Sequence, residues 1–201
     1  MKCVIALLSL SFCFCLLCSG QALQESSLLK EHFSNDEILE LEKISQFFQD
    51  QIEEGCQFED LDSCYHQYTD RVLMTLQKKS VLDYYMSDAE VESLLNELDS
   101  SVFNEVFRYS MTTRHAEDGS TTQKKTLDIN MQGKYFAFFR DLSSEKQVLV
   151  GILRAVETGG DWSPMLDIGF IEEAQLFNYN DPVDRLILAV HYLIANCRYK
   201  G

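Results

Sequence analysis

Apolar residues recur at intervals of three and four along much of the chain, most clearly between residues 35 and 54. The positions concerned are Ile38, Leu41, Ile44, Phe48 and Ile52. This spacing places them on one face of a helix. Ser34 and Glu37 have the spacing of a capping box that opens the helix, and Gly55 is placed to end it. We therefore predict an amphipathic helix over residues 35–54.

A second helix with one apolar face is predicted over residues 60–79. Its face consists of Leu61, Tyr65, Tyr68, Val72 and Leu76. Because only a short segment joins it to the first helix, we expect the two to form an antiparallel hairpin. Cys56 and Cys64 flank the connecting turn, and we predict a disulfide between them in an oxidising compartment. Cys197 is then left as a buried thiol, an intermolecular bridge or the partner of one of the other two.

Residues 87–106 continue with helical periodicity after a second capping-box pattern at Ser87 and Glu90, with an interruption near residues 99–101. Residues 110–126 then lack apolar periodicity and are rich in Thr, Ser, Lys and His. We predict a polar loop here, and the alternative is a short β-hairpin that turns at Asp118-Gly119. The loop is favoured because few β-branched apolar residues flank the turn.

The C-terminal half, residues 127–201, contains an aromatic cluster followed by further helical patterns. Ser163-Pro164 and Asp181-Pro182 each place a capping residue before a proline at the first helical position. The last pattern, residues 182–196, is apolar on nearly every side, which is typical of a central buried helix. The predicted fold is all-α: a compact multi-helix bundle with an N-terminal helical hairpin, a buried C-terminal helix and, in the alternative, a small β-hairpin within residues 110–130.

The first 22 residues have the layout of a secretory signal peptide. A positive charge at Lys2 precedes an almost wholly apolar run, and the small residues Gly20 and Ala22 come before the expected cut. The apolar run, about 14 residues long, is shorter than the roughly 20 residues that span a bilayer as a helix. We predict that residues 23–201 form a single helical domain, secreted or periplasmic, without a transmembrane segment. Its parts are an N-terminal half (23–109), the polar loop (110–126) and the C-terminal half (127–201).

Cys18 offers a different interpretation of the leader, as the lipid-bearing cysteine of a bacterial lipoprotein. That signal takes a small residue directly before the cysteine and usually a leucine three positions before it. The chain has Leu17 and Cys15 at those positions. We therefore favour plain secretion over lipid anchoring.

The charge of the chain is strongly negative and lies mostly near its beginning. The formal net charge is −15 at pH 7, and residues 23–62 contain twelve acids against two lysines. Nucleic acid and anionic lipid are polyanions, so this charge argues against both as partners. It favours a protein with a basic surface as the partner. The alternative is that the acids only solvate a helix face.

Motifs for catalysis or cofactor binding are lacking. After residue 22 the sequence has no Gly-x-Ser-x-Gly, no Cys-x-x-Cys, no phosphate-binding glycine loop and no His-Glu-x-x-His. We predict no cofactor and no metal, and we do not favour an enzyme. The competing hypotheses are a secreted hydrolase that uses His191 with Asp184 or Glu172, and a carrier of an apolar ligand. The carrier would use the aromatic-rich centre formed by Phe136, Phe139, Trp162, Phe170 and Phe177.

One feature of the first helix does indicate a binding surface. The face opposite the apolar stripe contains Asp36, Glu40, Lys43, Asp50 and Glu54. Phe47 lies in the middle of this polar face, with Leu39 near its edge. An aromatic ring surrounded by acids suits a basic, partly apolar partner. We name Phe47, Glu40, Asp50 and Glu54 as candidate binding residues. We expect an exported acidic helical binding or scaffold protein, or more specifically an inhibitor or immunity-type protein. The alternative is that another part of the chain covers Phe47.

Overall fold

The computed structural model describes residues 21–79, 86–115, 120–159 and 162–199. Most of these residues are helical, as the periodicity predicts. The elements in chain order are α2 (Gln21–Gln24), α3 (Ser27–His32), α4 (Asn35–Glu54), α5 (Leu61–Lys79), α6 (Asp88–Glu97), α7 (Ser100–Val106), β1 (Phe107–His115), β2 (Thr121–Ile129), α8 (Lys134–Ser143), α9 (Gln147–Gly159), α10 (Pro164–Glu173), the 3-10 turn η1 (Ala174–Leu176) and α11 (Pro182–Tyr199). The signal-peptide prediction and Cys18 fall on residues 1–20, outside the described residues.

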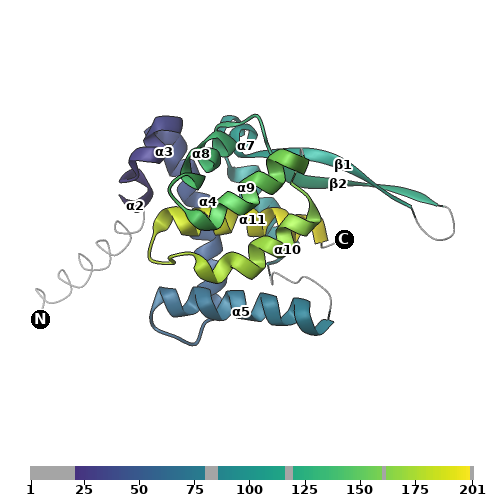
Figure 1. Cartoon of the computed structure of the whole chain (residues 1–201), viewed down its shortest axis with the longest axis horizontal. Coiled ribbons are helices and arrows are strands. Elements are labelled where there is room, and N and C mark those ends of the chain that lie inside the picture. The colour runs from purple at the N-terminus through teal and green to yellow at the C-terminus, as the bar shows by residue number, and fades with distance from the viewer. Residues whose placement is uncertain (1–20, 80–85, 116–119, 160–161, 200–201) are drawn as a thin grey trace, which may run out of the picture.

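Helix α11 lies at the centre of the fold, and the other helices surround it (Figure 1). It contacts α4 along one side and β2, α10 and α2 on others. Its side chains from Leu186 to Asn196 are all buried. The prediction of a buried C-terminal helix is therefore confirmed. The physical reason is that a helix with apolar residues on every side is stable in water only when other elements cover all of it.

Helix α4 packs its predicted stripe against α11. Ile38, Leu41, Ile44, Phe48 and Ile52 are the buried residues of this helix. The capping box is present: the Ser34 hydroxyl accepts from the Glu37 N–H, and Glu37 Oε2 accepts from the Ser34 N–H at 2.8 Å. The capping box predicted at Ser87 and Glu90 is wrong, because the Ser87 side chain makes no cap hydrogen bond, although Ser87 is the N-cap residue of α6.

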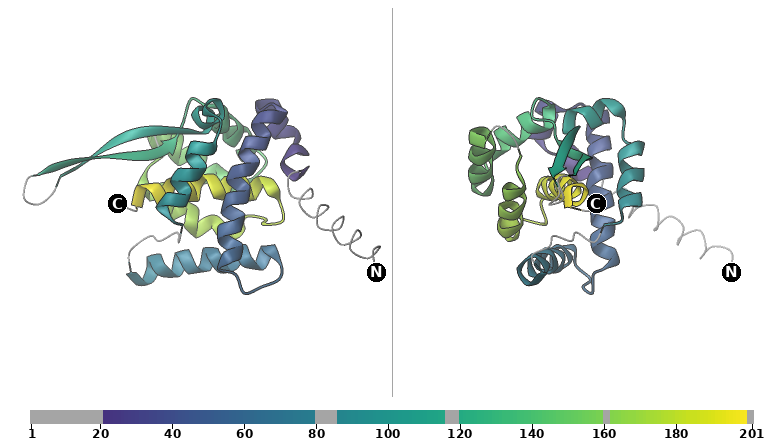
Figure 2. Two further views of the ribbon diagram at one scale, coloured as in Figure 1. Left: turned by 180° about the vertical axis from the view of Figure 1, so that it is seen from behind. Right: turned by 90° about the vertical axis from the view of Figure 1, so that its right-hand side faces the viewer.

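Cys56 and Cys64 form the predicted disulfide between α4 and α5, with Cα atoms 5.3 Å apart. Such a bond fits an oxidising, extracellular compartment. The two helices cross rather than lie antiparallel as expected (Figures 1 and 2). The reason is that α5 divides its apolar face between α4 and the α10–η1 segment. Of the three states considered for Cys197, the structure has a thiol, and burial raises its pKa to about 11.

The polar segment expected to be a loop is instead a β-hairpin, which was the alternative interpretation. Strands β1 and β2 pair antiparallel from Phe107–Ile129 at the base to His115–Thr121 near the tip. The base is apolar, since Phe107, Leu127 and Ile129 are buried. Figure 2 shows the hairpin projecting well beyond the helices. The expected turn residues Asp118-Gly119 lie outside the described residues.

A buried ionic cluster fixes the base of the hairpin to the body. Arg198 near the end of α11 pairs with Asp128 of β2 at 2.5 Å and with Asp167 of α10 at 2.7 Å. Trp162 Nε1 donates to the other oxygen of Asp167, and the Ser110 hydroxyl donates to Asp128. The cluster therefore joins four segments that are distant in sequence.

None of the helices in the described ranges is both long enough and apolar enough to cross a bilayer.

Candidate functional site

A groove of about 780 Å³ runs along the outward face of α4. This α4 groove is bounded by α6 on one side and by α2 and the beginning of α11 on the other. In the left view of Figure 2, α4 lies in front of α11 and α6 lies beside α4. Phe47 lines the groove and is partly buried, and Leu39 lines it with 46% of its surface exposed. Phe47 is therefore neither fully covered nor fully exposed.

Acidic residues outnumber basic ones in the lining of the α4 groove. The acids are Glu42, Asp50, Glu90 and Glu97. The bases are Lys43 and Arg185. Asp50 is exposed, and its Oδ1 accepts from Gln46 Nε2 at 2.7 Å one turn earlier. The predicted combination of Phe47 with Asp50 thus lies within one concave surface.

Glu40 and Glu54, the other two candidate residues, do not line the groove. The Glu40 carboxylate accepts from Lys43 Nζ at 2.6 Å and from the Asp99 N–H at 3.0 Å. Burial raises the pKa of Glu40, but these two hydrogen bonds outweigh burial and hold it below its ordinary value. Glu40 therefore fixes the junction of α6 and α7 against α4. Glu54 is exposed in the last turn of α4.

Glu42 is the groove residue that sequence reasoning missed. Its Oε1 is buried and has no hydrogen-bond partner among the described residues. Burial raises the pKa of this carboxyl above its ordinary value. A buried acceptor without a donor costs free energy. The available signal was its position at the border between the apolar stripe and the polar face, next to Leu41.

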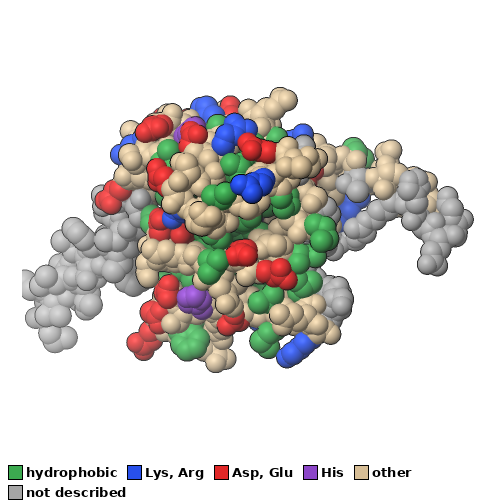
Figure 3. All heavy atoms as spheres, viewed as in Figure 1, with side chains coloured by type: hydrophobic (Ala, Val, Ile, Leu, Met, Phe, Trp, Pro, Cys, Tyr) green, Lys and Arg blue, Asp and Glu red, His purple; other side chains and the backbone are tan. Residues whose placement is uncertain are grey.

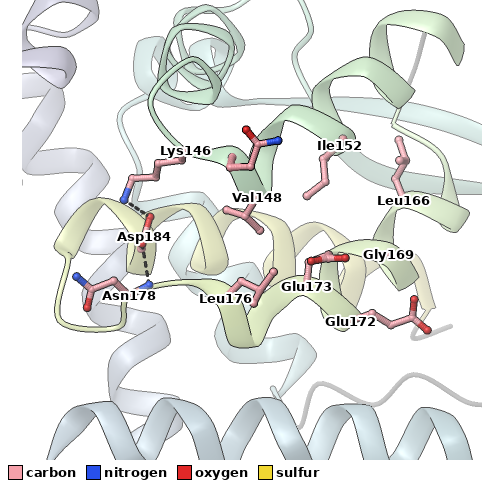
Figure 4. Close-up of a pocket in the computed structure, with 12 residues that line it drawn as sticks. Lys146, Val148, Ile152, Leu166, Gly169, Glu172, Glu173, Leu176, Asn178 and Asp184 are labelled. Carbon is pink, nitrogen blue, oxygen red and sulfur yellow. Dashed lines mark hydrogen bonds and ion pairs between the residues drawn. The ribbon is translucent and has the colours of Figure 1, made fainter.

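A second groove, of about 840 Å³, lies on the opposite face of the molecule between α9, α10 and the beginning of α11 (Figure 4). At one end Lys146 Nζ pairs with Asp184 at 2.6 Å and with Asp181 at 2.7 Å. Burial raises the pKa of Asp184, although the hydrogen bond from Lys146 opposes this. Glu172 lines the other end. In Figure 3 hydrophobic side chains reach the surface between charged ones on this face.

His191, which the hydrolase hypothesis requires, is not part of that second groove. It is only 2% exposed, and its ring is stacked on Trp162 with the ring centres 4.2 Å apart. Phe170 lies close on another side, at 4.5 Å, and Nε2 is 3.4 Å from the Tyr135 hydroxyl. Burial lowers the pKa of His191 to about 3, so the imidazole is neutral. The structure thus brings Asp184 and Glu172 to one groove but leaves His191 in the core.

The aromatic residues of the carrier hypothesis pack directly against one another or the same histidine. Phe139, Trp162 and Phe170 all contact His191, Phe136 stacks on Phe139, and Phe177 contacts Phe170. All five aromatic side chains are buried. This arrangement is that of a packed core.

Comparison with known proteins gives no family for the chain. No family model matches it, and neither a curated protein nor a solved structure does. The functional argument therefore depends on the two grooves and on the charge of the chain.

Proposed function

We propose that this chain is an exported binding protein that docks a basic, partly apolar protein partner in the α4 groove. Its more specific form is an inhibitor or immunity-type protein that masks a basic active site. The observation that carries the proposal is that Phe47, Glu42 and the exposed Asp50 line one groove, with Oε1 of Glu42 lacking a hydrogen-bond partner among the described residues. An apolar anchor surrounded by groups of one charge is a common arrangement in protein interfaces.

Three further features support export and a basic partner. The first 22 residues have the layout of a leader, and the Cys56–Cys64 disulfide fits an oxidising compartment. The net charge of −15 would attract a basic protein at long range and speed its association. A cation placed against Glu42 would also lower the pKa of that carboxyl and favour its charged form.

The test uses the protein produced with its leader and recovered from the exported fraction, with fluorescence anisotropy of labelled peptides. One peptide alternates lysine and leucine, and its matched control has glutamate in place of lysine. We expect binding of the first alone, and weaker binding at high salt. The Phe47→Ser variant should bind about tenfold or more weakly, the usual range for an interface anchor. Phe58→Ser is the matched control, because Phe58 is 55% exposed outside the groove.

A second variant separates binding from folding. Glu42→Gln keeps the size of the side chain and removes a group whose charged form is disfavoured by burial, so stability should be unchanged or higher. Binding of the lysine peptide should nevertheless weaken. Glu172→Gln, in the second groove, is the control and should change neither. Equal affinity of the two peptides, or equal effects of Phe47→Ser and Phe58→Ser, would refute the proposal.

A further inference from the structure

The β1–β2 hairpin carries a partly exposed patch beside α6 and α7. The Tyr109 ring packs against Phe103 of α7, with the ring centres 5.4 Å apart, and Tyr109 and Lys125 border a hollow shared with α6. On one face of the sheet, Tyr109 is 48% and Met111 is 61% exposed. Lys125, opposite Met111 in the register, is on the same face, with its ammonium 3.6 Å from the centre of the Tyr109 ring. Two-stranded hairpins are marginally stable alone, and exposed apolar groups beside a cation are typical of an interaction site.

The two strands differ in charge from the rest of the chain. Within them, Asp128 is the only acid, and Arg198 already pairs with it. The basic residues of the strands are Arg108, Arg114, Lys124 and Lys125. Lysines on exposed strands also hinder edge-to-edge pairing between two like hairpins. The hairpin therefore suits an acidic surface, although Glu117 and Asp118, which lie between the two strands in the sequence, moderate the charge.

We propose that the hairpin of one copy docks in the α4 groove of a second copy, an inference that rests on the proposed function of that groove. The chemistry matches on both sides. Tyr109 and Met111 would meet Phe47 and Leu39, and the Lys125 ammonium would meet the acids of the groove. The lengths match as well. The groove floor from Leu39 to Asp50 is about 17 Å of helix, and Tyr109 to Arg114 is about 17 Å of strand.

The fold makes this contact intermolecular. In Figure 1 and in the left view of Figure 2 the hairpin points away from the helices, and Tyr109 and Lys125 border α6 and not the α4 groove, so the patch does not fill the groove of its own copy. A contact between two different surfaces is head-to-tail and leaves one hairpin and one groove open at the ends. The average mass should therefore rise with concentration instead of stopping at a dimer. A contact this short belongs to the weak class of interfaces.

Each copy has a net charge of −15, so whole copies repel one another at long range. At physiological salt this repulsion is screened beyond about 8 Å, while groups in direct contact are screened much less. The measurement is therefore made at physiological ionic strength.

The experiment is sedimentation velocity of the exported full chain from about 1 to about 300 µM, the range suited to a weak interface. Wild type should increase in average mass. Asp50→Lys in the groove and Lys125→Glu on the hairpin should each stay monomeric. Mixed together, they should associate again, because Asp50→Lys retains an intact hairpin and Lys125→Glu retains an intact groove. Met111→Glu, which keeps Lys125, should also stay monomeric. Glu172→Lys in the second groove is the control for the change of charge, and it should associate as wild type does.

A wild type that stays monomeric over this range, or a mixture that does not associate, overturns the inference. Association that survives both Asp50→Lys and Lys125→Glu overturns it too, since another surface would then be responsible. The peptide assay separates this failure from that of the proposed function. Monomeric wild type with Phe47-dependent peptide binding leaves the groove as a site for a basic partner and removes only the second copy. If wild type stays monomeric and peptide binding does not depend on Phe47, both proposals are refuted.

Discussion

Acid should destabilise this protein through His191, and the size of the effect follows from its position. The imidazole is enclosed by Trp162, Phe170, Phe139 and the Tyr135 hydroxyl. Burial, reinforced by the charge of Arg198, lowers its pKa from 6.5 to about 3. The unfolded chain therefore binds this proton at a higher pH than the folded chain does. Stability is fully present above pH 6.5 and is lost as the pH falls from there towards 3.

The linkage relation gives a loss of about 2 kcal/mol between about pH 7.5 and about pH 5 from this residue alone. The matched variant is His191→Phe, which keeps an aromatic ring between Trp162 and Phe170 but cannot titrate. Its absolute stability will differ from that of wild type because the contact with Tyr135 is lost. The informative quantity is the change with pH, which should be about 2 kcal/mol smaller in the variant.

Urea unfolding at each pH measures this difference, and Trp162, the one tryptophan of the chain, supplies the fluorescence signal. Asp184 has a raised pKa, so its own contribution has the opposite sign, but it is common to both proteins and cancels. Equal losses of stability in wild type and His191→Phe would refute the argument. So would a folded-state titration of His191 near pH 6.5 by NMR.

Three further stability predictions follow from particular contacts. Ser34→Ala removes the side-chain cap of α4 and should cost about 1 kcal/mol in urea unfolding, whereas Ser87→Ala, at a helix start without such a bond, should cost much less. Replacing Cys56 and Cys64 by serine opens a loop of separation 8 and should cost about 2.5 kcal/mol under non-reducing conditions. Arg198→Met removes the cation that pairs with the buried Asp128 and Asp167 and should cost about 3 kcal/mol.

The helices were predictable because their apolar residues repeat with the period of the helix. In α4 the five stripe residues are the buried residues of that helix, and α11 is buried because it has no polar side to expose. The interruption predicted near residues 99–101 corresponds to the break between α6 and α7, where the Asp99 side chain caps the second helix. Each of these features depends on residues that are close in sequence.

The hairpin was misjudged because its anchoring residues lie outside the segment that looked polar. Phe107 in β1 and Leu127 and Ile129 in β2 are buried, whereas residues 111, 113, 120–123 and 125 between them are exposed. Threonine favours strands through its branched Cβ, yet it adds nothing to an apolar count. A pattern search that scored threonine as a strand former would have favoured the hairpin.

The candidate site was half predictable, and the limit is physical. Phe47 and Asp50 were identified because the helical period places them on the outward face of α4, where an aromatic ring among polar groups is conspicuous. The helical period places Glu40 on the same outward face. In the structure, however, its carboxylate accepts a hydrogen bond from the backbone N–H of Asp99, 59 residues away in the sequence. No local pattern reports such a contact.

The walls of the α4 groove likewise depend on contacts between segments that are distant in sequence. A polar face with Lys43, Gln46 and Asp50 cannot be covered by an apolar helix without loss of solvation, so α6 and α2 pack beside α4 and leave that face open. The periodicity thus dictates that an open face exists, while long-range packing decides which side chains border it. Glu90 illustrates this: by sequence it completes a capping box, yet in the structure it borders the groove. If a partner does bind there, its contacts should therefore include α6 residues that no property of α4 alone would identify.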